Sequence, residues 1–333
     1  MDIIRPRLTD YHGIHKNQAD LDFAIQFFDE DIPLYVDPFL LWKSPSQQDN
    51  ALYTTITNSF NHLNYLIKKK QEDEALSILI DISECHEVGL GVSKTRKGTK
   101  ISEKQAQDIL SLFKDIPEYS QFGFTHFEII QLYISGISKD RISDITCNYL
   151  KSFLIDYTIE QCEINKIPTE GVILNSIYNY KTNKLDTNQK VYLPVNPLTK
   201  EPLIFTPKRW LRFNTWINYE DYFQKYCPRD EIFNPDEPEE RVKVLNFNRE
   251  NYGTIEGYIE YKIKTSENCK NDPLFSQIPI LSAKRKLSQI LKLNTGKDHG
   301  ADMQYEELSA SLLASLFYPH LDFAQTQSRT ESG

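Results

Sequence analysis

The sequence is poor in glycine, and it lacks the segments that mark a secreted or membrane-spanning protein. Only 12 of its 333 residues are glycine. The N-terminus has no apolar signal core, and no stretch approaches the roughly 18 consecutive apolar residues needed to cross a bilayer. These absences predict a soluble cytoplasmic protein that has no membrane partner.

The sequence also lacks the cysteine spacing of a disulfide framework or a zinc ribbon. Its 5 cysteines are scattered, and none belongs to a C-x-x-C pair. An odd number of isolated cysteines favours reduced thiols. The carboxylates of Asp29, Asp31 and Asp37 offer oxygen ligands, but a solvated acidic turn accounts for them better. We therefore expect no metal site and no cofactor in this chain.

The chain lacks the excess of positive charge that is typical of proteins that bind nucleic acid along their whole surface. Its formal net charge is −9, which argues against a protein that coats DNA or RNA without specificity. Any contact with nucleic acid must then use local basic patches. The sequence contains three candidate patches.

The first patch is a basic turn at residues 89–102, where three glycines flank four cations. The cations are Lys94, Arg96, Lys97 and Lys100. Ser102 and Gln105 have the spacing of a capping box, which predicts that a helix begins directly after the turn. The N-terminus of a helix favours phosphate. Two interpretations stay open, a solvated surface turn and a contact with a phosphate backbone or another anion.

The basic turn does not have the spacing of a nucleotide-binding loop. Gly89, Gly91 and Lys94 match neither G-x-G-x-x-G nor G-x-x-x-x-G-K-[ST]. An NTPase is therefore excluded.

The second patch interleaves cations with aromatic residues, and the third is a cluster of cations alone. The second contains Lys208, Arg209, Trp210 and Arg212, and Trp216 and several tyrosines follow it. Such a pattern is typical of a surface on which bases stack, although aromatic residues at helical spacing more often pack in a core. The third patch consists of Lys284, Arg285 and Lys286.

The hydrophobic periodicity predicts an α+β fold that is predominantly α-helical. A helical domain is expected over residues 1–165 and a mixed region over 166–333, with a β-hairpin at 191–206. The polar stretch 181–190 is expected to be a connector. The predicted helices span residues 51–70, 72–85, 102–113, 125–135, 140–163, 249–264 and 303–318.

One pair of segments spells a nuclease motif without supporting the chemistry. Asp236 follows a proline, and Glu260-Tyr261-Lys262 lies 24 residues further on, in the order of PD-(D/E)XK. That chemistry needs Asp and Glu on neighbouring strands and a lysine on the same side as the glutamate. The apolar residues around residue 260 recur with a helical period, so we expect Glu260 and Lys262 on nearly opposite faces of a helix.

The last 31 residues resemble the entry to a PD-(D/E)XK restriction-endonuclease-like core of bacterial defence proteins. Tyr305-Glu306-Glu307-Leu308 through residue 320 is similar to the helix that precedes the catalytic strands, and residues 325–333 look like the approach to the first strand. The resemblance implies that Glu306 or Glu307 is the catalytic helix glutamate. It also implies that the natural chain continues past Gly333, and that Mg²⁺ would bind in a core that follows.

Together these observations predict a recognition or regulatory region of a bacterial nuclease-type anti-phage defence protein. It would bind DNA or RNA through the basic patches and would not cut by itself. The alternative is a protein–protein adaptor whose acidic surface and exposed aromatic residues bind a partner subunit. An autonomous metal-dependent enzyme is the third possibility, but no nucleophile–base pair supports it.

Overall fold

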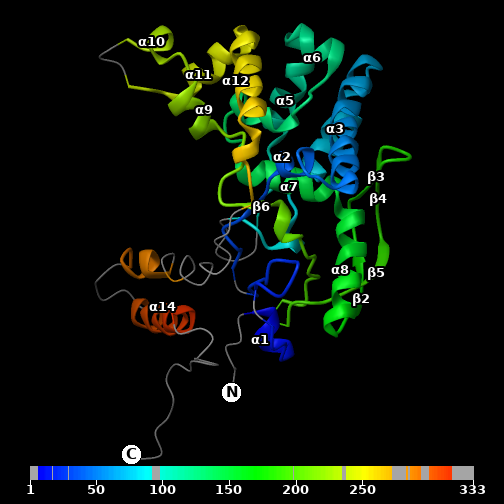
Figure 1. The fold of residues 1–333 in the computed structure, drawn as a ribbon, viewed down its shortest axis with the longest axis vertical. Coiled ribbons are helices and arrows are strands. Elements are labelled where there is room, and N and C mark those ends of the chain that lie inside the picture. Colours follow the sequence, from blue (N-terminus) through cyan, green and yellow to red (C-terminus); the bar gives the residue numbers. More distant parts are fainter. Residues whose placement is uncertain are drawn as a thin grey trace, which may run out of the picture.

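In a computed structural model the protein is mostly helical, and its described residues form three small antiparallel sheets (Figure 1). This confirms the predicted α+β, predominantly helical class. Within the described part, no helix is long and apolar enough to cross a membrane. The structure describes residues 7–16, 18–28, 30–91, 98–197, 199–234, 238–271, 283, 286–293 and 300–316.

The first half of the chain is a set of packed helices. They are α1 (Leu8–His12), α2 (Pro38–Trp42), α3 (Gln47–Lys68), α4 (Glu72–Asp81), α5 (Glu103–Asp115), α6 (Pro117–Phe122), α7 (Lys139–Tyr149) and α8 (Lys151–Asn165), with 3-10 turns η1 (His86–Val88) and η2 (Phe127–Leu132).

Local sequence signals explain where several helices begin and which face they bury. The Ser46 side chain accepts a hydrogen bond from the Asp49 amide and caps α3, whose Ile56, Phe60 and Leu63 are fully buried. At the start of α5, both hydrogen bonds of the predicted capping box between Ser102 and Gln105 are present.

Two predicted helices differ from the observed ones. The segment 125–135 contains only the short 3-10 turn η2. The predicted helix 140–163 is divided into α7 and α8 at Leu150, a fully buried residue that ends one helix and begins the next. The chain turns there, and the apolar period of three to four residues continues on both sides, so periodicity alone did not reveal the break.

The second half of the chain contributes further helices. They are the 3-10 turn η3 (Lys208–Trp210), α9 (Tyr219–Lys225), α10 (Arg229–Ile232), α11 (Arg241–Glu250), α12 (Tyr252–Lys264), the 3-10 turn η4 (Ser266–Asn268) and α14 (Ala301–Leu316). The predicted helix 249–264 is thus mainly α12. It is separated from α11 at Asn251, whose side-chain amide donates to the Phe247 carbonyl at 2.8 Å.

Each sheet has two antiparallel strands. The pairs are β1 (Tyr35–Val36) with β6 (Leu211–Arg212), β2 (Glu170–Leu174) with β5 (Gln189–Leu193), and β3 (Ile177–Asn179) with β4 (Lys184–Asp186). The hairpin β3–β4 therefore lies within residues 177–186, and its second strand occupies the expected connector.

The segment 191–206 is only in part a hairpin. Its turn closes through one bridge between Val195 and Pro202, but its first strand belongs to β5 and pairs with β2. The Leu203 amide still donates across the hairpin to the Pro194 carbonyl at 2.8 Å, but the Ile204 amide donates to the Glu87 carbonyl, at 3.0 Å, in a distant part of the chain. Strand propensity located the first strand and the turn but gave no information about the partner.

The main hydrophobic core contains residues from both sides of position 165, for example Ile155 and Leu174. Buried polar side chains join distant segments across it. The amide of Gln26 donates to the carbonyls of Val88 and Ile204, each at 2.7 Å. Three segments of the chain therefore meet at one side chain.

Candidate functional site

The first and third basic patches lie mostly outside the described residues, as do Lys94, Arg96, Lys97, Lys284 and Arg285. Two members of these patches are placed, and each forms an ion pair. Lys100, half-exposed, pairs with Asp81. Lys286 is nearly buried and lies 3.6 Å from the Glu30 carboxylate.

The second patch, residues 208–216, is bonded to the rest of the protein, and we call it the paired segment. The Arg209 guanidinium donates two hydrogen bonds, at 3.1 and 3.0 Å, to the buried carboxylate of Asp49. The ammonium of Lys208 donates to backbone carbonyls of the 18–19 segment. The ring of Trp210 is 1% exposed, so it offers no face on which a base could stack.

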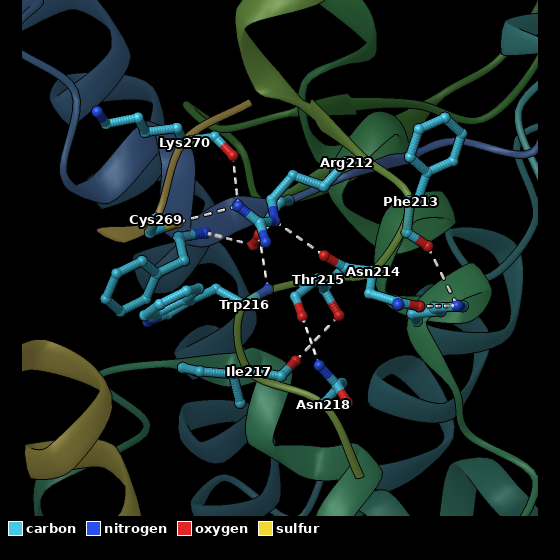
Figure 2. Close-up of polar contacts among 12 residues, drawn as sticks. Arg212, Phe213, Asn214, Thr215, Trp216, Ile217, Asn218, Cys269 and Lys270 are labelled. Atoms are coloured by element: carbon cyan, nitrogen blue, oxygen red, sulfur yellow. Dashed lines mark hydrogen bonds and ion pairs between the residues drawn. The ribbon is translucent and has the colours of Figure 1, made fainter. Parts of the chain in front are cut away.

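Arg212 also points inward (Figure 2). Its guanidinium lies 3.4 Å from the Asp37 carboxylate and donates to the carbonyls of Asn214 and Lys270. Asp37 is fully buried and accepts hydrogen bonds from the amides of Phe39 and Trp216. Burial raises the pKa of Asp37 to about 7, although Arg212 acts to lower it.

A second buried polar network lies close enough to Asp37 for its Glu128 carboxylate to raise the pKa of Asp37. The hydroxyl of Tyr53 lies 2.7 Å from Nδ1 of His126, and the same nitrogen lies 3.3 Å from the Glu128 carboxylate. All three side chains are buried, and aromatic rings of Phe39 and other residues pack around His126. The network therefore joins elements of the core.

The residues of the two nuclease-like motifs are not brought together as a metal site. In α12, Glu260 is exposed, whereas Lys262 is 4% exposed and its ammonium lies 2.7 Å from Asp221, so the two face opposite ways as expected. Asp236 lies outside the described residues. Glu306 and Glu307 are in α14. Among the residues the structure describes, no three His, Cys, Asp or Glu side chains form a metal-binding group.

A groove of about 520 Å³ lies between α3 and the β3–β4 hairpin, which are neighbours in the fold (Figure 1). Most of its lining comes from one face of α3. The lining side chains are Thr55, Asn58, Ser59, Asn61, His62, Tyr65, Tyr180 and Asn183. We call this feature the α3 groove.

Aromatic rings are exposed in the α3 groove. Tyr65 is 52% exposed and Tyr180 is 39% exposed. The imidazole of His62 stacks on Tyr65, with ring centroids 5.3 Å apart and planes 24° apart. Burial lowers the pKa of His62, an effect that nearby Glu74 opposes, which favours a neutral ring near pH 7.

The hairpin holds Tyr180 in place through a buried neighbour. Tyr178, two residues earlier, is buried and packs its ring edge-on against Tyr149 at 4.8 Å. Its hydroxyl donates to the Asn183 side chain at 3.1 Å, across the hairpin turn. Tyr180 lies in the turn directly after β3, and its ring centroid is 6.5 Å from that of Tyr178. The buried Tyr178 therefore anchors the turn whose Tyr180 lines the groove.

Lysines lie beside the groove, at the end of α3 and at the hairpin tip. Lys68, Lys69 and Lys70 are exposed, and within the described part of the chain none of them is in an ion pair with a carboxylate. The ammonium of Lys68 donates to the Ser120 carbonyl instead. The ammonium of Lys69 lies 5.6 Å from the Tyr65 ring centroid. On the hairpin, Lys181 is exposed and Lys184 lies 3.4 Å from Glu74.

Sequence reasoning missed this groove because it followed only the apolar face of α3. Thr55, Asn58, His62 and Tyr65 are spaced by three or four residues, and this polar spacing was a usable signal. The partner hairpin was not available as a signal, since residues 181–190 were expected to be a connector.

The comparisons with known proteins identify a family but no function. The family model described as "Domain of unknown function (DUF8370)" matches residues 13–218, more than half of the chain. The chain belongs to this family. No curated protein and no solved structure matches it. Both α3 and the β3–β4 hairpin fall within the matched residues.

Proposed function

For this member of a family of unknown function, we propose a recognition region that binds single-stranded nucleic acid in the α3 groove. The observation that carries the proposal is the gathering of exposed aromatic rings at one groove, with the ammonium of Lys69 beside the ring of Tyr65. The proposal keeps the nucleic-acid-binding function expected from the sequence but assigns it to the α3 groove instead of the three basic patches.

The rings provide sequence-tolerant contacts. Tyr65 and Tyr180 present exposed faces, and base–aromatic stacking contributes about 1–3 kcal/mol per base. The neutral imidazole of His62 adds a third planar group at Tyr65. Because bases in a duplex are already stacked on one another, this arrangement favours a single strand.

The lysines provide phosphate contacts near those rings. Lys69 and Lys70 follow α3, four and five residues after Tyr65, so a strand whose base stacks on Tyr65 would carry its phosphates past them. The side chains of Asn58, Ser59 and Thr55 add hydrogen-bonding groups along the groove. Stacking, cations and polar groups together are the elements of a single-strand platform.

The same proposal includes the context given by the resemblance of the C-terminal residues. The groove would be the recognition part of a bacterial nuclease-type anti-phage defence protein, and the described residues would perform no cleavage. Any Mg²⁺ would belong to a nuclease core and would not bind in the groove.

The test is the affinity for labelled 12-nucleotide single strands of DNA and RNA, measured by fluorescence anisotropy at several salt concentrations. We expect binding that weakens with salt, and weaker binding to a duplex of the same length. Tyr65→Ala should raise Kd by roughly 5- to 150-fold, which corresponds to the loss of one stacked base. Absence of binding to every single strand at 50 mM salt would overturn the proposal.

Tyr192→Ala is the matched control for this experiment. Tyr192 is 57% exposed, close to the value for Tyr65, but lies on β5 outside the groove. Its replacement should leave Kd unchanged. Equal losses in both variants would show that the groove is not the binding site.

A second candidate function is the protein–protein adaptor, which one observation favours. Ile173 is 65% exposed and lies on the same face of the β2–β5 sheet as Tyr192, because Ile173 pairs with Lys190 and Gly171 with Tyr192. A partner subunit bound there should co-purify stoichiometrically with the wild type and be lost from Ile173→Ser in native mass spectrometry. A fully monomeric wild type purified from its own host would contradict this function.

A further inference from the structure

A second hollow lies where α7 begins, on elements separate from the α3 groove. Its volume is about 190 Å³, and β1, η2, α7, α9 and α11 each contribute to its walls. Its lining side chains are Tyr35, Gln131, Ser138, Lys139, Asp140, Tyr219, Glu220 and Arg241. A volume of this size accommodates a small molecule.

Arg241 brings a positive charge to this pocket, and its contacts with the described residues are with neutral groups. Its guanidinium carbon lies 4.0 Å from the centroid of the Tyr219 ring. One terminal nitrogen donates to the carbonyls of Gln131 and Ile137, at 3.3 and 3.0 Å. The Nε atom is buried and has no hydrogen-bond partner among the residues that the structure describes. A buried donor without an acceptor is costly, so an acceptor in the pocket would stabilise it.

Lys139 brings a second positive charge, and it too is bonded to neutral groups. Its ammonium lies 4.9 Å from the Tyr35 ring centroid and donates to the Phe213 carbonyl at 3.1 Å and to the Asn214 side chain. Within the described residues, neither Lys139 nor Arg241 is in an ion pair with a carboxylate. Burial lowers the pKa of Lys139, and the nearby carboxylates of Glu220 and Asp140 act to raise it. The two cations therefore offer charged donors to an anion without a close carboxylate partner of their own among the described residues.

The start of α7 adds a third favourable element. This helix has 11 residues, and its N-cap, Ser138, makes no side-chain capping hydrogen bond. Both Ser138 and the first helical residue, Lys139, line the pocket. The amides and dipole of a helix N-terminus favour an anion.

We infer that this pocket binds a small anion bearing a carboxylate or phosphate group, held between Arg241 and Lys139 at the start of α7. Asp140 and Glu220 also line the pocket and repel such an anion. Their presence favours a ligand that is small enough to approach the two cations without contacting both carboxylates. No residue of this pocket belongs to the α3 groove, so either site can fail while the other is retained.

The test is isothermal titration calorimetry of the full chain with inorganic phosphate and, separately, with sodium acetate, at constant ionic strength set with chloride. We expect saturable binding of at least one of them at a single site, and the comparison distinguishes a phosphate from a carboxylate ligand. Saturable binding of neither anion would overturn the inference.

Two variants with opposite expected effects locate the site. Arg241→Gln should weaken the anion about tenfold or more, because it removes a charged donor. Glu220→Gln should tighten it about threefold, because it removes a repelling, exposed carboxylate. Glu220→Gln keeps the inference falsifiable if Arg241→Gln fails to fold, since unchanged or weaker binding in that variant would contradict it.

The matched control is Arg229→Gln. Arg229 lies on the neighbouring helix α10, where it pairs with Glu239 at 3.5 Å, and it does not line the pocket. This variant should bind the anion as the wild type does. An equal loss in Arg229→Gln and Arg241→Gln would show a general charge effect and would overturn the inference.

Discussion

The paired segment and the α3 groove contain the same residue types, lysine or arginine beside aromatic rings, but the protein uses them differently. In the paired segment, Arg209 and Arg212 form ion pairs with Asp49 and Asp37, and the ring of Trp210 is buried. In the groove, the rings are exposed and the lysines at the end of α3 have no carboxylate partner among the described residues.

The difference is that the carboxylates near the paired segment come from far away in the sequence. Asp49 is 160 residues from Arg209. A cluster of cations therefore identifies a surface only when no distant carboxylate neutralises it. The following predictions test this difference, beginning with the largest effect.

Arg212→Met should destabilise the protein by about 3 kcal/mol at pH 8, the lower end of the range for breaking a buried ion pair. The lower end applies because Asp37 keeps hydrogen bonds from two backbone amides. Urea unfolding measures the loss. The affinity of the folded variant for single strands should not change. Weaker binding at unchanged stability would show that Arg212 belongs to an interface after all.

Replacing Lys69 and Lys70 together by Gln should affect binding and leave stability nearly unchanged. Each phosphate contact contributes about 0.7 to the slope of log K against log salt for a single strand, so the slope should fall in magnitude by about 1.4. Anisotropy at 50 to 200 mM salt measures this slope. Lys208→Gln is the control, because its ammonium is bonded to carbonyls. The same slope change in that control would remove the distinction between the two regions.

The destabilisation caused by Arg212→Met should itself depend on pH. Folding raises the pKa of Asp37 from 3.8 to about 7, so its neutral form stabilises the fold at low pH, and this stabilisation is lost as pH rises through about 7. Arg212 is needed only when Asp37 is ionised. Without Arg212 the pKa of Asp37 rises further, so the loss of stability should be smaller at pH 5 than at pH 8, by up to about 1.4 kcal/mol, since pH 8 lies about one unit above the wild-type pKa.

Urea unfolding at both pH values checks this difference. Glu128 also raises the pKa of Asp37, so Glu128→Gln should lower it and reduce the pH dependence. An equal loss at pH 5 and pH 8 would mean that Asp37 is ionised throughout that range.

The smallest effect is expected from Tyr178→Phe. This change removes the hydroxyl that bonds to Asn183 and keeps the ring that packs on Tyr149, at a cost of about 1 kcal/mol in the hairpin. The affinity for a single strand should fall by up to about fivefold, and hydrogen exchange at Lys181 and Thr182 should quicken. Faster exchange with unchanged affinity would show that the position of Tyr180 does not matter for binding.

The sequence predicted best those features that depend on neighbouring residues. The capping box at Ser102 and Gln105 was confirmed because both of its hydrogen bonds span only three residues. The opposite faces of Glu260 and Lys262 followed from the helical period. These features need no information about the tertiary fold.

Features that depend on distant partners could not be predicted. The strand at Val191 pairs with the strand at Val172 and not with the segment 203–206 that follows it. The two possible partner segments have similar strand propensity, so propensity could not decide between them. The cations of residues 208–212 could not be distinguished from surface cations, because nothing near them in the sequence marks Asp49 or Asp37 as a partner. Predicting the groove would have required pairing the polar face of α3 with the β3–β4 hairpin, and Tyr180 of that hairpin comes 115 residues after Tyr65 of α3.

The side chain of Gln26 also sets an order of events during synthesis. Its amide bonds to the carbonyl of Ile204, which is 178 residues later in the chain. A ribosome adds roughly 5–20 residues per second, so roughly 10 to 35 seconds pass between the synthesis of Gln26 and the synthesis of Ile204. Until then the N-terminal segment cannot complete its packing. A chaperone that binds nascent chains would find this segment available for most of that interval.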